Sequence, residues 1–244
     1  MTNSHRSCAR VTRISGLLAS GLMAGVLLST QPNIAQAGEL LVTPKNQQTI
    51  FRAETGKLTP KKFKFGVSTS GGKKTWKLKS YPAWFTASPL KGKARKKKKQ
   101  TVILTPIKEK IDKLGPGIHT KKVQFSYKNG GKEKIVKRNV KMMIEGDPDA
   151  GLVVFQNKCI GCHDLFQNMA GPYLRGVYGR EAGTANGYNH SAELRDYGKV
   201  WEEENLNDWL TNPQKLVPNS KMYLSLSNST DRMNVIAYLK SLTL

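Results

Sequence analysis

The five residues Cys159-Ile160-Gly161-Cys162-His163 decide how the second half of this 244-residue chain folds and what it binds. The pattern Cys-x-x-Cys-His is the attachment site of a c-type haem. Two cysteines three positions apart at the end of a helical turn point the same way, so each sulfur can reach one vinyl group of a single porphyrin. The histidine that follows is then held beneath the ring, where an imidazole nitrogen can bind the iron. The motif therefore predicts one covalent haem c, with Cys159 and Cys162 as anchors and His163 as an iron ligand.

Two other kinds of site use a Cys-x-x-Cys pair. One is a thioredoxin-like redox pair, and the other is half of a structural zinc site. The chain has three cysteines, and the third, Cys8, lies far from the pair. Because the sequence holds no second Cys-x-x-Cys pair, the cysteine spacing favours haem over both alternatives.

The first 37 residues have the layout of a secretory signal peptide. Three arginines between positions 6 and 13 precede a 16-residue, largely apolar run, Ile14 to Ser29, and Ala35-Gln36-Ala37 follows as a small-x-small cleavage site. A membrane span needs about 20 apolar residues, so the short run favours cleavage after Ala37 over an uncleaved anchor. Cleavage would leave only the two cysteines of the haem motif. We therefore expect an exported protein, with the periplasm as its compartment.

Net charge divides the mature chain into two modules. Residues 38–145 hold 28 Lys and Arg against 6 Asp and Glu, a net charge of +22, whereas residues 146–244 hold 9 against 11, a net charge of −2. Lengths of 108 and 99 residues each suit one compact domain. At the boundary, Asp147 can cap a helix that begins at Pro148, because proline at the first helical position loses no hydrogen bond.

The second module, residues 146–244, has helical spacing at both ends and loop motifs between them. Gly151, Phe155 and Cys159 recur every four residues, while residues 231–242 predict a final helix and residues 206–210 a short one. The motifs between these helices are, in chain order, Gly171-Pro172-Tyr173-Leu174-Arg175-Gly176-Val177-Tyr178-Gly179-Arg180, Gly187-Tyr188, Val200-Trp201 and Val217-Pro218-Asn219-Ser220-Lys221-Met222. Over about residues 148–243, this order resembles the class I cytochromes c of mitochondrial and alphaproteobacterial type.

The resemblance implies a set of haem contacts. It makes Met222 the second axial ligand, opposite His163, and such His/Met ligation raises the haem potential. It has the Pro172 carbonyl accept a hydrogen bond from the His163 ring, which fixes the ring's orientation. It places Arg180 and Trp201 on the inner haem propionate, with core packing as the alternative for Trp201. The full set is Cys159, Cys162, Pro172, Arg180, Tyr188 and Trp201 on the cofactor, and His163 and Met222 on the metal.

Two other methionines compete with Met222, since a methionine can also serve as core filler. Met169 lies six residues past the histidine, and Met233 falls on the predicted final helix. The preceding Pro-x-x-Lys and the 59-residue offset from His163 favour Met222 as the ligand. The resemblance also implies that the first and last helices cross, with Gly151 allowing their close approach.

The sequence departs from the family pattern at four positions. Trp209 stands where a tyrosine often approaches the methionine sulfur, and an indole N–H can donate but not accept. His190 takes the place of a propionate-binding tyrosine, and is either its replacement or an exposed loop residue. Asn219 replaces a glycine, which asparagine tolerates because it enters left-handed conformations readily. Gln214 replaces a lysine at the haem edge, so this module alone attracts acidic partners poorly.

The first module, residues 38–145, reads as antiparallel β-structure. Alternating apolar residues occur at 63–67, 76–78, 123–127 and 140–144, with glycine- and proline-rich turns between them. About seven or eight short strands in this length favour a Greek-key sandwich. The order of tryptophans and turns over residues 39–145 is similar to BACON-type immunoglobulin-like domains. A carbohydrate role does not follow, because Trp76 and Trp84 are better explained as core residues.

The first module also carries a lysine load beyond what solubility needs. Residues 91–99 hold seven Lys and Arg, which we expect to form a hairpin loop, and Lys77 and Lys79 share the outer face of one strand. Strand lysines discourage sheet pairing, but a net charge of +22 on one domain also predicts an anionic partner. The candidates are a membrane surface, an acidic polysaccharide or an acidic redox protein. Nucleic acid is disfavoured by export and by the lack of a reading motif.

These features together predict a two-domain, exported monohaem cytochrome that transfers single electrons between redox proteins and is not itself an enzyme. The basic domain would dock it through charge. One alternative is a haem-based enzyme or ligand sensor in which Met222 is labile. Another is the cytochrome subunit of a periplasmic dehydrogenase complex.

Overall fold

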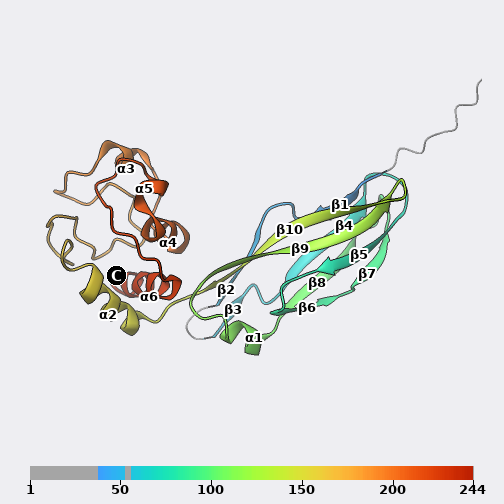
Figure 1. Cartoon of the computed structure of the whole chain (residues 1–244), viewed down its shortest axis with the longest axis horizontal. Helices are drawn as coiled ribbons and strands as arrows, with labels where there is room; N and C mark the ends of the chain where they lie inside the picture. The colour runs from blue at the N-terminus through green and yellow to red at the C-terminus, as the bar shows by residue number, and fades with distance from the viewer. Residues whose placement is uncertain (1–37, 53–55, 244) are drawn as a thin grey trace, which may run out of the picture. The chain divides into compact units, whose positions relative to one another are not determined.

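The computed structural model describes residues 38–52 and 56–243. The predicted signal peptide, residues 1–37, lies outside the described residues. The strands end at Ile144, and the first helix of the second module begins at Pro148 (Figure 1). Within the described part of the chain, no helix is long and apolar enough to cross a membrane.

In its described residues, the first module contains ten strands in two sheets, two or three more strands than the sequence pattern predicts. The difference includes β3, two residues long, and β7, whose small and charged residues give no apolar alternation. The strands are β1 (Leu40–Thr43), β2 (Gln48–Arg52), β3 (Leu58–Thr59), β4 (Phe63–Thr69), β5 (Lys74–Ser80), β6 (Phe85–Ser88), β7 (Lys91–Ala94), β8 (Gln100–Pro106), β9 (Gly117–Asn129) and β10 (Lys132–Ile144), and a short helix, α1 (Lys108–Asp112), follows β8. One sheet has the order β1-β4-β8-β6 and the other β3-β2-β10-β9-β5-β7. The strand pairs are antiparallel as predicted, except that β2 and β10 pair in parallel.

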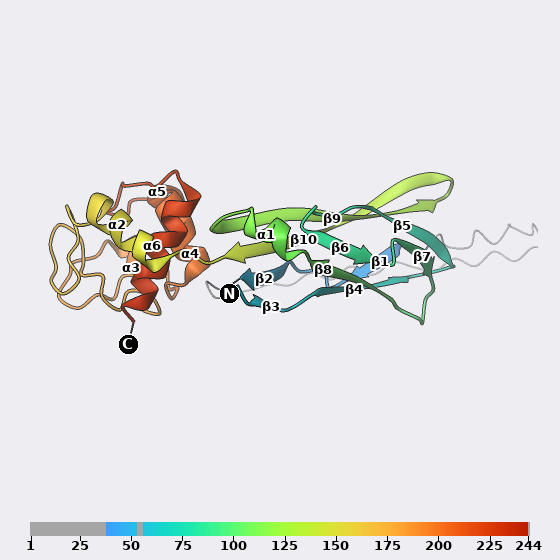
Figure 2. The same cartoon turned by 90° about the horizontal axis from the view of Figure 1, so that it is seen from below.

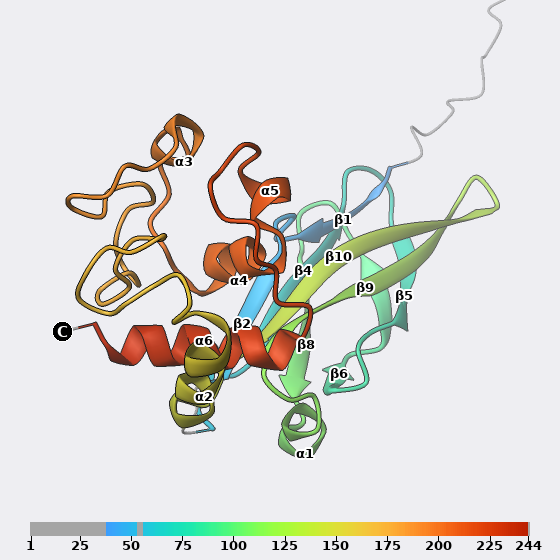
Figure 3. The ribbon, with the colours of Figure 1, turned by 60° about the vertical axis from the view of Figure 1, so that its left-hand side comes forward.

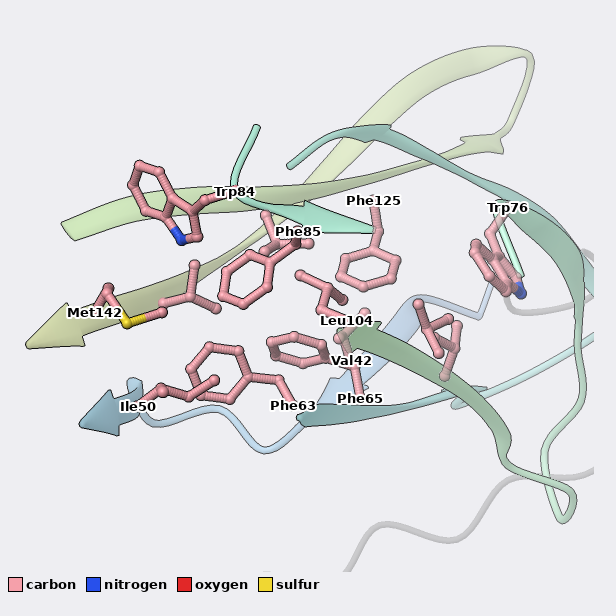
Figure 4. Close-up of a cluster of buried hydrophobic side chains, with 14 of the residues drawn as sticks. Val42, Ile50, Phe63, Phe65, Trp76, Trp84, Phe85, Leu104, Phe125 and Met142 are labelled. Atoms are coloured by element: carbon pink, nitrogen blue, oxygen red, sulfur yellow. The ribbon is translucent and has the colours of Figure 1, made fainter. Parts of the chain in front are cut away.

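The two sheets enclose one hydrophobic core, to which both contribute alternate residues (Figures 2 and 4). Phe65 of β4 meets Phe125 of β9 edge to face at 5.8 Å between ring centroids, which joins the sheets directly. Trp76 is fully buried and Trp84 nearly so. The prediction that both tryptophans are core residues is confirmed, and a packed pair of β-sheets is the observed architecture. The immunoglobulin-like family of this module stays a prediction.

The sequence predicts a hairpin loop for the lysine run at 91–99, and this prediction is wrong. Residues 91–94 form β7, which pairs with β5, whereas β8 belongs to the other sheet. Residues 91–94 form a strand because small and charged residues alternate along them. Ala94 is buried and Gly92 partly so, whereas Lys91 and Lys93 are exposed. The remaining basic residues, 95–99, connect the two sheets.

The second module is helical, with long loops between its elements. Its helices are α2 (Pro148–Lys158), α3 (Ala192–Asp196), α4 (Glu203–Thr211), α5 (Pro213–Leu216) and α6 (Ser229–Ser241). The predicted cap is confirmed, because Asp147 Oδ1 accepts hydrogen bonds from the Asp149 and Ala150 amides at 2.8 and 3.3 Å. The final helix begins two residues earlier than the pattern indicated, since Asn228 caps it in the same way.

The first and last helices of this module, α2 and α6, cross in close contact (Figure 3). At the crossing, a Cβ on Gly151 would lie 2.0 Å from the Asn234 carbonyl oxygen, so only glycine fits. Beside it, the rings of Phe155 and Tyr238 pack with centroids 5.4 Å apart. This crossing fixes the end of α2, where the Cys-x-x-Cys-His motif begins.

Candidate haem site

The Cys-x-x-Cys-His motif forms a tight turn at the end of α2. Cys159 is the C-cap of the helix, and its amide donates to the Phe155 carbonyl at 2.8 Å. The amides of Cys162 and His163 both donate to the Cys159 carbonyl, at 3.1 and 2.9 Å. Both thiols are free and line one cavity. Burial raises the pKa of the Cys159 thiol to about 11.

The His163 imidazole is held by the loop that follows the motif. Its Nδ1 lies 2.7 Å from the Pro172 carbonyl oxygen. A carbonyl only accepts, so Nδ1 carries the proton and Nε2 keeps a free lone pair. Burial lowers the pKa of His163, against a smaller opposite effect of this hydrogen bond. A Cβ on Gly171 would lie 2.3 Å from the ring's Cε1, so this glycine makes room for the imidazole.

Met222 reaches the same cavity from the loop after α5. Its sulfur accepts a hydrogen bond from the Trp209 indole, with 3.2 Å between Nε1 and Sδ. Its carbonyl accepts one from the Gln214 amide at 2.8 Å, and the same amide nitrogen lies 2.7 Å from the Ser220 carbonyl oxygen. Asn219 turns the loop with φ of 64°, the left-handed conformation expected of it. Met222 is therefore fixed at both its backbone and its sulfur.

A group of polar side chains lines another part of the cavity wall. The Arg180 guanidinium donates to the Tyr173 carbonyl at 2.9 Å and lies over the Tyr173 ring. The Tyr188 hydroxyl donates to the Ala170 carbonyl at 2.6 Å. The Trp201 indole is buried and packs against Trp209, with ring centroids 5.4 Å apart. Cationic and hydrogen-bonding groups at this wall suit a ligand that carries carboxylates.

His190 belongs to this polar group and is the member with an unmet hydrogen bond. Only 6% of its surface is exposed, so it is not the exposed loop residue that the sequence left open. Its Nε2 is buried without a hydrogen-bond partner, and the residue lines the cavity. Burial lowers the pKa of His190, and the nearby Arg180, Arg195 and Lys221 lower it further. A buried polar atom of this kind needs a partner, and an anion in the cavity would provide one.

The cavity has the size and chemistry for a haem. It has a volume of about 410 Å³. Its apolar lining residues include Leu174, Val177, Leu206, Leu210, Val235 and Leu239. Two thiols, a free imidazole nitrogen, a thioether and an anion-binding wall meet within it, which matches an apolar macrocycle with an iron and two carboxylates. In the described part of the chain, no three His, Cys, Asp or Glu side chains come together to hold a metal, so a zinc site lacks its remaining ligands.

Comparison with known proteins agrees with this geometry. A family model described as cytochrome c matches residues 148–243. Cytochrome c of Cannabis sativa is 37% identical over 102 residues, which cover 40% of this chain and 92% of that protein. Cytochrome c2 of Rhodoblastus acidophilus is 44% identical over 98 residues, which cover 38% of this chain and 91% of that protein. The chain belongs to the cytochrome c family. The solved structure of cytochrome cH from Methylobacterium extorquens is 40% identical, with a TM-score of 0.38, and the match covers 39% of this chain and 99% of that one.

Cytochromes c bind a covalent haem c, and the cavity of this cytochrome c holds every residue that the sequence singled out for that cofactor. These residues are Cys159, Cys162, His163, Pro172, Arg180, Tyr188, Trp201 and Met222. Met169 and Met233, the competing methionines, are not among the residues that line it. The hydrogen bond from His163 to Pro172 has the partners that the resemblance implied.

One functional residue of this cytochrome c was missed by sequence reasoning. Gln214 stood out only as a missing lysine, but its amide nitrogen bonds Ser220 twice and Met222 once, and so holds the methionine loop. A glutamine eight residues before the methionine gives no signal by itself, because amide contacts depend on how the loop folds back. The Trp209 donor could be inferred from indole chemistry, but not its direction toward sulfur.

Proposed function

We propose that this cytochrome c is an exported one-electron carrier in which His163 and Met222 would both bind the iron of a single haem. The observation that carries the proposal is the 2.7 Å contact between His163 Nδ1 and the Pro172 carbonyl oxygen, which directs the free Nε2 to metal binding. The Met222 thioether lines the same cavity. When bound, the haem supplies a one-electron Fe(III)/Fe(II) couple. The protein would then keep the iron bound by both side chains and present the cofactor to redox partners.

The remaining site residues divide into anchors and carboxylate partners. Cys159 and Cys162 would hold the haem through two thioether bonds. Arg180 and Trp201 would bind the inner propionate, and Tyr188 would complete that wall. His190, in the imidazolium form that a nearby carboxylate would favour, would donate a hydrogen bond from its unpartnered Nε2 to a propionate. Such pairing matters because a buried carboxylate without partners costs several kcal/mol, on the order of 5.

An enzyme or ligand sensor is the competing function, and it requires Met222 to leave the iron. In the sequence, this function is favoured only by Trp209, which stands where a tyrosine often approaches the methionine sulfur. The hydrogen bonds from Trp209 and Gln214 onto Met222 favour a held methionine and therefore a carrier. The second alternative is a cytochrome subunit of a periplasmic dehydrogenase. In that case the protein would co-purify stably with a dehydrogenase from periplasm.

Visible and near-infrared spectra of the oxidised protein test the ligand assignment. We expect a low-spin His/Met signature in the wild type that is lost in Met222→Ala. The matched control is Met169→Ala, which removes an exposed methionine outside the cavity and should leave the spectrum unchanged. A high-spin wild-type spectrum, or a signature that survives Met222→Ala, would contradict the proposal.

Export and docking complete the proposed function. Export rests on the arginines, apolar run and cleavage site of residues 1–37, and it predicts a periplasmic protein whose N-terminal residue is Gly38.

Docking rests on the net charge of +22 over residues 38–145. Because exposed charges are screened beyond about 10 Å at 0.1 M salt, raising the salt concentration should weaken association with an anionic partner. An affinity for the anionic partner that does not change with ionic strength would contradict the docking role.

A further inference from the structure

Seven lysines of the first module lie on one face of its six-stranded sheet. Lys77 of β5 pairs with Lys91 of β7 and with Ser126 of β9, and Ser126 pairs with Ile135 of β10. These positions therefore share one face, and residues two places away along each strand share it too. The opposite face carries Trp76 and Phe125, which are buried in the core.

Seven exposed lysines lie on this outer face, which we call the basic face. They are Lys77, Lys79, Lys91, Lys93, Lys122, Lys128 and Lys137. One acidic residue stands among them, Glu133, whose carboxylate lies 2.9 Å from Lys79 Nζ. Neighbouring strands lie about 5 Å apart, and same-face residues recur about every 7 Å along a strand. The lysines of this face are therefore closely spaced and repel one another. An anionic surface against the face would offset that repulsion.

The composition of the basic face distinguishes between anionic partners. Protein interfaces are enriched in arginine and aromatic residues and depleted in lysine. Across β7, β5, β9 and β10 the basic face has neither arginine nor an aromatic ring, because Trp76, Phe125 and Tyr127 point into the core. The same lack of exposed rings removes the stacking platform that sugar binding would use. Lysine is a compact, hydrated point charge that suits phosphates without a fixed register.

We propose that the basic face of β7, β5, β9 and β10 binds the surface of a membrane rich in anionic phospholipid headgroups. The proposal rests on the docking role suggested above and names both its surface and its partner. Each lysine near such a surface contributes about 1 kcal/mol, equal to a factor of about five in affinity. Binding at this face would keep the exported cytochrome at the membrane through charge alone.

Vesicle binding by the full-length, haem-loaded protein tests the proposal. The probes are vesicles of phosphatidylcholine and vesicles that also contain phosphatidylglycerol, at low and high salt. The test variant is Lys77→Gln/Lys122→Gln/Lys128→Gln, on the basic face. The matched control is Lys61→Gln/Lys62→Gln/Lys64→Gln, which removes the same charge from exposed lysines at and next to β4, in the other sheet.

We expect salt-sensitive binding to the phosphatidylglycerol vesicles, weakened about 100-fold in the basic-face variant and less than threefold in the control. An unchanged haem spectrum and unfolding curve would show that both variants fold. An equal loss of vesicle affinity in the two variants would show that the basic face is not the binding surface, while charge-based docking would still hold. Binding to an acidic protein or polysaccharide but not to these vesicles would overturn the lipid assignment. No salt-sensitive binding to any anionic probe would overturn the docking role as well.

Discussion

At the scale of single residues, the site depends on hydrogen bonds that end on the two proposed iron ligands. Pro172 orients His163, while Trp209 and Gln214 hold Met222 at its sulfur and its backbone. The motif predicts the anchors and the histidine because its spacing lets both sulfurs and one imidazole reach a single porphyrin. It could not predict the groups around Met222, since Trp209 and Gln214 approach it only after the loop has folded.

The indole N–H of Trp209 should raise the reduction potential of the bound haem. A donor to the sulfur draws electron density from Met222 and so disfavours Fe(III) relative to Fe(II). For Trp209→Phe we therefore expect a potential lower by about 20–60 mV, the equivalent of one hydrogen bond of about 0.5–1.5 kcal/mol. Potentiometric titration measures the shift, and Trp209→Tyr, which restores a donor, is the control. An unchanged or higher potential in Trp209→Phe would show that the contact does not tune the iron.

At the scale of elements, the crossing of α2 and α6 positions the haem motif. Sequence spacing identified both helices and the Asp147 cap, because capping and apolar periodicity are local properties. The short helices α3 and α5, of five and four residues, are too short to show apolar periodicity, although Ser191 and Asn212 cap them. Strand β7 was misread as part of a loop, because its burial depends on the partner strand β5 rather than on its own apolar residues.

The helix crossing should not tolerate a side chain at Gly151. A Cβ there would meet the Asn234 carbonyl oxygen at 2.0 Å and the Tyr238 Cβ at 2.8 Å, so the helices must separate. We expect Gly151→Ala to lower the free energy of unfolding by about 1–3 kcal/mol, measured by denaturant titration with haem absorbance as the probe. The control is Gly161→Ala, where an added Cβ meets no atom within 4 Å. Equal stability of the two variants would exclude a tight crossing.

A partly buried ion pair between Glu203 of α4 and Lys240 of α6 should make stability depend on acidic pH. Burial raises the pKa of Glu203, but hydrogen bonds from Lys240 and Tyr178 outweigh it and hold the pKa below 4.5. The carboxylate therefore stabilises the fold above that pH, and its contribution is lost as the pH falls through the lowered value. At neutral pH we expect Glu203→Gln to cost about 1–2 kcal/mol.

Acid unfolding curves of the wild type and Glu203→Gln test this dependence. The stability difference between the two proteins should shrink as the pH is lowered from 4.5. A difference that stays constant or grows toward acid pH would mean that the charge of Glu203 does not stabilise the helix pair.

At the scale of the whole molecule, the haem cavity and the excess positive charge fall in different parts of the chain. The family match and the haem cavity lie within residues 148–243, whereas nearly all the excess positive charge lies in residues 38–145. Charge counting located that excess from sequence alone. Sheet register was needed to show that seven of the lysines share one face, since strand neighbours far apart in sequence cannot be paired by composition.

A potentiometric titration of the intact haem-loaded protein, with and without carbon monoxide, tests the central claim most directly. A carrier with His163 and Met222 on the iron should follow a one-electron Nernst curve, and carbon monoxide should leave that curve unchanged because no axial position is open. A potential that moves with carbon monoxide would show that Met222 leaves the iron readily. That result would contradict the electron-carrier function and favour a ligand-binding haem.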